Sequence, residues 1–173
     1  MEEGTMKEAR KVGRGVQPIP EGYHTITPML AVGNAAEAIE FYKRAFGAEE
    51  LGRMNGPDGE SVVHAELRIG DSRFFLCEDG PESGPRSPES LGGASCSFYL
   101  YVEDVDKAFK KAVGAGAKIK QPVTDMFWGD RSGSVTDPFG CQWDLATRKE
   151  DVPPEEMKKR GEEFLKSLSR EPH

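Results

Sequence analysis

The chain has 173 residues, of which 36% are hydrophobic, so it can form one compact domain or two small lobes. Its formal net charge of -7 argues against a nucleic-acid-binding surface, which would need clustered basic residues. No apolar run approaches the roughly 18 residues of a transmembrane helix, and the N-terminus has no apolar signal core. We therefore expect a cytoplasmic protein with neither nucleic acid nor a membrane as a partner.

The three cysteines, Cys77, Cys96 and Cys141, include no C-x-x-C pair. An odd count without such spacing argues against a disulfide framework and against a zinc ribbon. The sequence instead favours small buried thiols.

The first part of the chain predicts an arm followed by a β-α-β-β-β unit. Residues 1–22 combine glycines, prolines and mixed charge, which is typical of a flexible N-terminal arm. Residues 25–32 predict a strand, and Asn34 with Glu37 predicts the capped start of a helix that Gly47 ends. Strictly alternating residues follow and predict hairpin strands, so we assign residues 23–80 to a first βαβββ module.

The pattern then repeats after a segment rich in proline, glycine and serine, residues 81–94, which we interpret as a linker. Residues 96–102 predict a strand, Asp104 caps a helix, and residues 137–140 (Asp-Pro-Phe-Gly) form the turn of a hairpin. An offset of 70 residues aligns Val32 with Val102 and Gly70 with Gly140. Residues 95–150 are thus a second βαβββ module, and residues 151–173 are a C-terminal helix and tail.

Three motifs resemble the vicinal oxygen chelate superfamily, and more narrowly the PhnB-like branch of the glyoxalase/bleomycin-resistance proteins. They lie at residues 32–48 (V-x-x-x-x-x-A-I-x-F-Y-x-x-A-F-G-A), 64–71 (H-A-E-L-x-I-G-D) and 127–143 (F-W-G-D-R…D-P-F-G-x-x-W). The resemblance implies an α+β fold in which two βαβββ modules form a cupped, barrel-like mixed sheet, with a C-terminal helix added here. It also implies a pocket inside the cup and a homodimer.

The resemblance further implies metal-ligand positions on the first and last strand of each module. By motif spacing these positions fall on Thr27, Phe74, Ser97 and Asp144. Only Asp144 is a plausible ligand, and a catalytic divalent ion generally needs about three ligands from His, Cys or carboxylates. We therefore expect no metal and no other cofactor, although a displaced ligand set stays open as an alternative.

Strand alternation assigns residues to the inside of the cup if the apolar sides of the strands face the helices. The resulting mixture of aromatic and scattered polar side chains is typical of small-molecule pockets. The cup-facing residues are Thr27, Met29, His64, Glu66, Arg68, Phe74, Ser97, Tyr99, Tyr101, Gln142 and Asp144, with Phe127 and Trp128 at the mouth. As ligand-binding residues we select Met29, Phe74, Tyr99, Tyr101, Phe127, Trp128 and Gln142.

His64 is a candidate catalytic residue with Glu66, because an imidazole titrates near physiological pH and can act as a general base. Alternatively, it is a hydrogen-bonded interior histidine. Asp144 is either a remaining metal-ligand position or the ion-pair partner of Arg68 or Arg131.

The aromatic residues have similar alternatives. Tyr99 and Tyr101 either hydrogen-bond a ligand or are ordinary strand aromatics, and Trp128 either stacks on a planar ligand or anchors the turn at Gly129. Asp130 and Arg131 are interpreted as a local ion pair.

The sequence therefore predicts a small-molecule-binding protein without the usual metal centre, and leaves open whether it is an enzyme. One alternative is a metal-dependent lyase, isomerase or dioxygenase-like enzyme that uses Asp144 with His64 and Glu66. A second is an interaction module whose cup is filled by its own side chains or by the C-terminal helix. The identity of the ligand does not follow from the sequence.

Overall fold

The protein, a computed structural model, is described over residues 16–80 and 84–168. Its first βαβββ module consists of β1 (Met29–Val32), α1 (Ala35–Phe46), β2 (Glu49–Asn55), β3 (Val62–Ile69) and β4 (Ser72–Glu78). Its second module consists of β5 (Ser97–Tyr101), α3 (Val105–Gly114), β6 (Lys118–Asp125), β7 (Asp130–Thr136) and β8 (Gln142–Arg148). Two further helices are α2 (Pro88–Leu91), between the modules, and α4 (Pro154–Leu168), after them.

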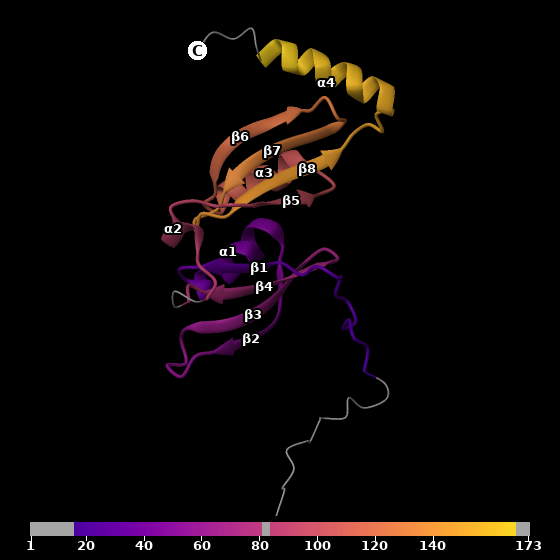
Figure 1. Cartoon of the computed structure of the whole chain (residues 1–173). Coiled ribbons are helices and arrows are strands. Elements are labelled where there is room, and N and C mark those ends of the chain that lie inside the picture. Colours follow the sequence, from indigo (N-terminus) through magenta and orange to yellow (C-terminus); the bar gives the residue numbers. More distant parts are fainter. Residues whose placement is uncertain (1–15, 81–83, 169–173) are drawn as a thin grey trace, which may run out of the picture.

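Each module forms its own four-stranded mixed sheet, in the orders β1-β4-β3-β2 and β5-β8-β7-β6. The first and last strands of each module pair in parallel, β1 with β4 and β5 with β8, whereas the remaining pairs are antiparallel. In Figure 1 the second module lies above the first, with β5 and β1 nearest the other module. The predicted α+β fold of two βαβββ modules with a C-terminal helix is confirmed, as an open cupped surface.

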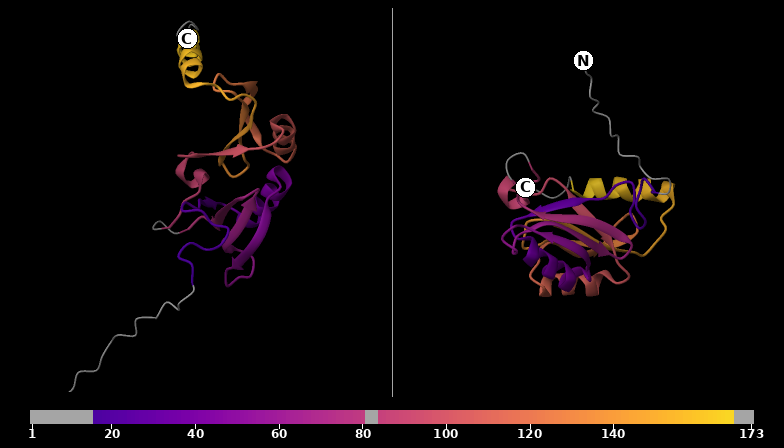
Figure 2. Two further views of the ribbon diagram at one scale, coloured as in Figure 1. Left: turned by 90° about the vertical axis from the view of Figure 1, so that its right-hand side faces the viewer. Right: turned by 90° about the horizontal axis from the view of Figure 1, so that it is seen from below.

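The helices α1 and α3 lie on the same side of the two sheets and contact each other, as the side and bottom views in Figure 2 show. This side holds the core, which includes Leu67 and Leu76 of the first module and Leu145 of the second. The opposite side carries α4 at one end (Figure 2). We call the sheet faces turned away from α1 and α3 the open faces.

Local sequence signals explain where the helices begin and end. The side chain of Asn34 accepts a hydrogen bond from the backbone N–H of Glu37 at 3.1 Å, and Asp104 caps α3 through the N–H of Lys107 at 3.0 Å. Gly47 ends α1 with a φ of 70°, which only glycine adopts without strain. All three predicted helix boundaries are confirmed.

The predicted turn between β7 and β8 is confirmed, and its aspartate is buried. Oδ1 of Asp137 accepts the backbone N–H groups of Phe139 and Cys141 at 2.9 and 2.8 Å, and Gly140 has a φ of 84°. Oδ2 of Asp137 accepts a hydrogen bond from the hydroxyl of Tyr42, on α1, at 2.8 Å. The turn therefore joins the two modules through one side chain.

Two predictions are wrong, one about where the first strand begins and one about the burial of Cys96. The first strand begins at Met29 and not at residue 25, because Pro28 has no N–H for a ladder, and Ile26 is 82% exposed. Cys96 is exposed, so only Cys77 and Cys141 are buried thiols.

Most of the predicted N-terminal arm, residues 1–15, lies outside the described residues, as do residues 81–83 of the predicted linker and 169–173 of the tail. The linker segment also contains α2, which begins at Pro88. Within residues 16–80 and 84–168, every helix is too short or too polar to cross a membrane.

Candidate functional site

The open face of the first module brings together residues from three strands. In the sheet register, Glu66 of β3 pairs with Phe75 of β4, and Phe75 pairs with Met29 of β1. Phe74 pairs with Leu67, which is fully buried, and its ring makes an edge contact with Tyr42 of α1 at 6.0 Å. Assigning Phe74 to the cup was therefore wrong, since it faces the helices and Phe75 takes the open face.

The error in assigning Phe74 comes from applying one offset to every strand. Met29 and Tyr99, which are 70 residues apart, occupy equivalent places, but their partners Phe75 and Asp144 are only 69 apart. Because side chains alternate along a strand, a slip of one residue moves a side chain to the other face. The structural counterpart of Asp144 is Phe75.

Glu66, which the sequence suggests as a candidate catalytic residue, is engaged in an ion pair. Nη1 of Arg73 lies 2.7 Å from Oε1 of Glu66, and the same guanidinium lies 4.7 Å above the ring of Tyr23. His64, two residues before Glu66, is half-buried, and its ring lies 4.9 Å from that of Phe75. Sequence reasoning missed Arg73 and Phe75, because only the register brings them to this face, and it missed Tyr23, which reaches them from the segment before β1.

On the open face of the second module, Asp144 accepts a hydrogen bond from the hydroxyl of Ser134, its cross-strand partner. The proposed pairing of Asp144 with Arg68 or Arg131 is wrong. Arg68 pairs with Glu49 at 2.6 Å, and Arg131 pairs with Asp106 and Asp125 at 2.8 and 3.1 Å.

The structure also tests the assignments of Gln142 and of the Asp130–Arg131 pair. Gln142 accepts a hydrogen bond from Nζ of Lys120 at 2.5 Å, which orients its amide on the open face. The predicted Asp130–Arg131 ion pair is wrong, because consecutive residues of a strand point to opposite faces.

Asp130 is instead the centre of an aromatic cluster. Its Oδ2 accepts hydrogen bonds from the hydroxyls of Tyr99 and Tyr101, both at 3.0 Å, and from Nε1 of Trp128 at 3.1 Å. Asp130 is 2% exposed, whereas Tyr99 and Tyr101 are 46% and 58% exposed. Tyr99, Tyr101 and Trp128, which the sequence suggested as ligand-binding residues, are thus brought together by the carboxylate of Asp130, which it did not suggest as one.

The aromatic surface continues from this cluster to the C-terminal helix. The rings of Phe127 and Trp128 are in edge contact at 5.0 Å, and Phe127 lies 5.2 Å from Phe164 of α4. An ion pair between Arg160 and Glu150, at 2.8 Å, holds α4 against the end of β8. Phe127 therefore links the open face to α4.

A cavity of about 350 Å³ lies where the two modules meet. Tyr99 and Ser97 approach it from the open face of β5, and Arg73 approaches it from β4. We call it the seam cavity. Its lining residues are His24, Ile26, Pro28, Ile69, Ser72, Arg73, Phe74, Ser97, Phe98, Tyr99, Leu100 and Trp143.

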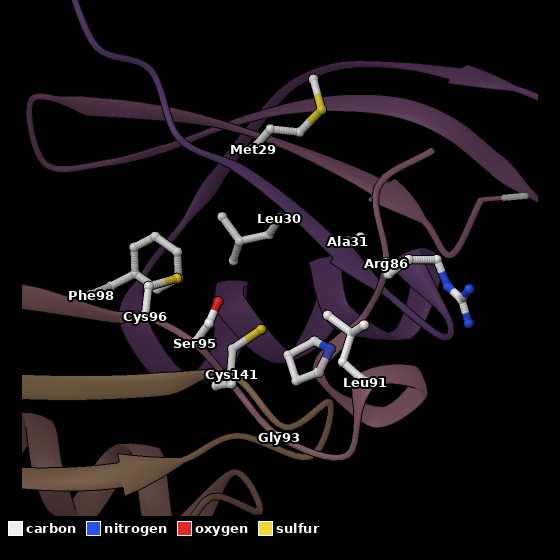
Figure 3. Close-up of a pocket in the computed structure, with 12 residues that line it drawn as sticks. Met29, Leu30, Ala31, Arg86, Leu91, Gly93, Ser95, Cys96, Phe98 and Cys141 are labelled. Carbon is white, nitrogen blue, oxygen red and sulfur yellow. The ribbon is translucent and has the colours of Figure 1, made fainter. Parts of the chain in front are cut away.

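A second cavity, of about 190 Å³, lies between β1 and the segment that contains α2. In Figure 3 Leu30, Leu91 and the thiols of Cys96 and Cys141 surround it, while the guanidinium of Arg86 points away. Burial raises the pKa of the Cys141 thiol to about 12, so this thiol is not a nucleophile near neutral pH. The lining is apolar and sulfur-rich and lacks an acid–base pair.

The donor set does not fit the divalent metal of the wider superfamily. The positions derived from the motifs hold Thr27, Ser97, Phe74 and Asp144, and replacing Phe74 by its structural counterpart Phe75 adds no ligand. Across residues 16–80 and 84–168, no three His, Cys, Asp or Glu side chains gather closely enough to hold an ion. We therefore derive no chemistry through a metal here.

Comparisons with known proteins agree with the fold. The family model described as Glyoxalase/Bleomycin resistance protein/Dioxygenase superfamily matches residues 23–145. The uncharacterized protein Rv0887c of Mycobacterium tuberculosis is 44% identical over 135 residues, which cover 76% of this chain and 79% of that protein.

Solved structures give the same result. A gene product of Arabidopsis thaliana has 34% identity and a TM-score of 0.58, covering 72% of this chain and 98% of its own. The PhnB protein of Bacillus cereus has 20% identity and a TM-score of 0.56, covering 72% of this chain and 99% of its own, and so shares the fold.

Proposed function

Since the chain belongs to the glyoxalase/bleomycin resistance protein/dioxygenase superfamily, we propose that it binds a small organic molecule in the seam cavity and on the adjoining open faces. The observation that carries this proposal is the cavity itself. Its volume of about 350 Å³ is at the lower end of the range of ligand pockets, and both modules line it.

The lining suits a ligand with an apolar body and a few polar groups. Trp143, Phe98 and Leu100 supply apolar surface, while the Tyr99 hydroxyl and the Arg73 guanidinium supply polar contacts at its edge. Pockets of this kind use apolar walls for affinity and a small number of placed polar groups for orientation. His64 and Glu66 lie on the same open face as Arg73 and are proposed as ligand contacts; catalytic roles for them have no such geometric support, because Glu66 is held by Arg73.

We propose that binding requires no resident metal or other cofactor. This is supported by the donor residues, since a threonine, a serine and a phenylalanine occupy places where metal-dependent relatives need His or carboxylate ligands. The proposed function is accordingly binding, with orientation by hydrogen bonds.

We also propose that the protein is a homodimer in which a second copy covers the open face of the first module. Met29 and Met54 are both more than half exposed there, and a second copy would remove them from water. Met54 pairs with His64 on the open face, whereas Val63 is on the opposite face by alternation and is 50% exposed. Met54→Glu should therefore produce monomers in sedimentation experiments, and Val63→Glu should not.

The test of binding is a thermal-shift screen with cationic, neutral and anionic aromatic molecules, followed by calorimetric titration of each molecule that raises the melting temperature. Ser97→Trp should fill the seam cavity and abolish binding. Lys110→Trp, which places the same side chain on an exposed position of α3, on the side opposite to the open faces, is the matched control and should bind normally. Ligands that bind Ser97→Trp as tightly as the parent protein would place the site elsewhere.

A further inference from the structure

The carboxylate of Asp130 has one oxygen with three donors and one with none. Oδ2 accepts hydrogen bonds from Tyr99, Tyr101 and Trp128. Oδ1 is buried and has no hydrogen-bond partner among residues 16–80 and 84–168. A buried carboxylate oxygen without a partner is costly, and native structures keep few of them without a functional reason.

The negative charge of Asp130 is also not cancelled by a direct ion pair. Within the described part of the chain, no lysine, arginine or histidine nitrogen lies within salt-bridge distance of it. Arg148 is its cross-strand partner; Nε of Arg148 is bonded to Asp151 at 2.7 Å, and the guanidinium also interacts electrostatically with Asp130 and Tyr101. The carboxylate of Asp130 is therefore bonded directly to neutral donors at the base of the aromatic cluster, and Arg148 offsets its charge without a direct bond.

The exposed side of the cluster presents two aromatic rings. The rings of Tyr99 and Tyr101 lie 5.1 Å apart at 55° to each other, so they form two walls of a shallow cage. Their hydroxyl hydrogens are directed to Asp130, so their oxygens can only accept; Trp128 and Ser132 face the oxygen of Tyr99, and Arg148 faces that of Tyr101. Aromatic faces carry negative quadrupole potential, and here they lie above a buried anion.

We propose that Tyr99, Tyr101 and Trp128 bind an organic cation, an amine or quaternary ammonium group, with the buried charge of Asp130 as the source of attraction. This rests on the proposed function, because Tyr99 also lines the seam cavity and so connects the cation site to the apolar site. The expected ligand is thus a molecule with an apolar body and a cationic group, separated by about the width of the Tyr99 ring. Anionic ligands are disfavoured by the same charge.

The two tryptophans of the chain make this site directly observable. The indole N–H of Trp128 donates to Asp130, and that of Trp143 donates to buried Asp137 at 3.0 Å. In a nitrogen–proton correlation spectrum these give two separate signals. Choline is the probe, and 3,3-dimethylbutan-1-ol, which has the same shape without the charge, is the control ligand.

We expect choline to shift the Trp128 signal saturably while the Trp143 signal stays in place, and we expect the alcohol to shift neither. Raising the salt concentration should weaken the choline affinity, because the attraction is electrostatic. The proposal is overturned by a Trp128 signal that does not respond to choline, or that responds equally to the alcohol.

Variants separate charge from aromatic surface. Asp130→Asn should weaken choline binding at least tenfold, and Tyr101→Leu, which removes one wall, should weaken it severalfold. Asp125→Asn removes the same charge from an exposed carboxylate bonded to Arg131, and should change affinity less than twofold. If Asp130→Asn does not fold, Tyr101→Leu decides, and unchanged affinity in that variant contradicts the cage.

The outcomes also separate this inference from the proposed function. If neutral aromatic molecules bind and Ser97→Trp abolishes their binding, but choline leaves Trp128 unmoved, the cation site is wrong and the seam-cavity proposal stands. If no molecule of the screen binds and choline also fails, both proposals are wrong. If choline alone binds at Trp128, the cation site is supported and the seam cavity loses its role.

Discussion

The hydroxyl of Tyr42 on α1 donates a 2.8 Å hydrogen bond to Asp137, which lies 95 residues further along the chain in the β7–β8 turn. The same oxygen accepts the indole of Trp143, and the other oxygen accepts two backbone N–H groups. Burial raises the pKa values of both Tyr42 and Asp137. This bond fastens the helix of the first module to the hairpin of the second, next to the seam cavity.

Removing this bond should lower the stability of the whole fold. Tyr42→Phe deletes the donor to a buried acid and should cost about 1.5–3 kcal/mol of unfolding free energy, as hydrogen bonds to charged groups do. Asp137→Ala leaves four donors without an acceptor and should cost more. Urea unfolding measures both, and Ser72→Ala, at an exposed serine, should stay within about 0.5 kcal/mol. Equal stability of Tyr42→Phe and the parent would show that the bond contributes nothing.

Glu50 should make stability depend on pH in acid. The hydrogen bond from Arg53 is the largest cause that lowers its pKa from the ordinary 4.5 to about 2; burial opposes this shift, and the hydrogen bond from Lys43 adds to it. The carboxyl group of Glu50 binds its proton less tightly in the folded state than in the unfolded state. Its contribution to the free energy of unfolding is therefore present above the ordinary pKa and is lost as the pH falls to about 2. Glu50→Gln should therefore destabilise the protein at pH 7.

At pH 2 the Glu50→Gln variant and the parent should unfold at nearly the same urea concentration, since this pH is about the folded pKa of Glu50 and well below its ordinary value, so most of the contribution of the charge is lost. Glu49→Gln is the matched control, because its carboxylate is 62% exposed and its ion pair with Arg68 is worth little. A gap between parent and Glu50→Gln that persists unchanged at pH 2 would rule out the charge as its cause.

Two glycines should respond oppositely to alanine. A Cβ at Gly133 would lie 2.9 Å from both Phe109 and Val123, so Gly133→Ala should cost about 1–3 kcal/mol through overpacking. A Cβ at Gly114, at the end of α3, would meet nothing within 4 Å, so Gly114→Ala should be neutral or stabilising by up to about 1 kcal/mol. Thermal unfolding compares them, and a stabilising Gly133→Ala would contradict the packing of α3 on β7.

The cysteines should differ in reactivity. Cys96 is exposed, whereas Cys77 and Cys141 are buried and burial raises the pKa of both thiols. Iodoacetamide at pH 8 should therefore label the native protein once, as mass spectrometry of the intact chain would show. Cys96→Ser should remove this labelling, and labelling of Cys141 in the native protein would mean that the cavity in Figure 3 opens readily.

Elemental analysis of protein purified without chelators or a histidine tag tests the proposed absence of a resident metal. Less than a tenth of an equivalent of zinc, nickel, manganese or iron should remain after dialysis. The loading should not increase after incubation with each ion. Stoichiometric metal in the parent, lost in both His64→Ala and Asp144→Ala, would contradict the proposal and support a metalloenzyme.

The sequence by itself determined the modules, the helix caps and the hairpin turn. Asn34, Asp104 and Gly140 act on backbone groups within a few residues, so their roles can be derived from local chemistry alone. The duplication, and with it the fold, follows because each module repeats the same local order.

Only the tertiary structure decided which side chains share a face across strands. The offset between modules is 70 residues at Met29 and Tyr99 but 69 at Phe75 and Asp144, and that single slip exchanges Phe74 for Phe75 on the open face. Likewise, Asp130 meets Tyr99 and Tyr101 across some 30 residues of chain. Such contacts depend on strand register. When both faces of a strand carry aromatic side chains, hydrophobic alternation does not distinguish between two registers that differ by one residue.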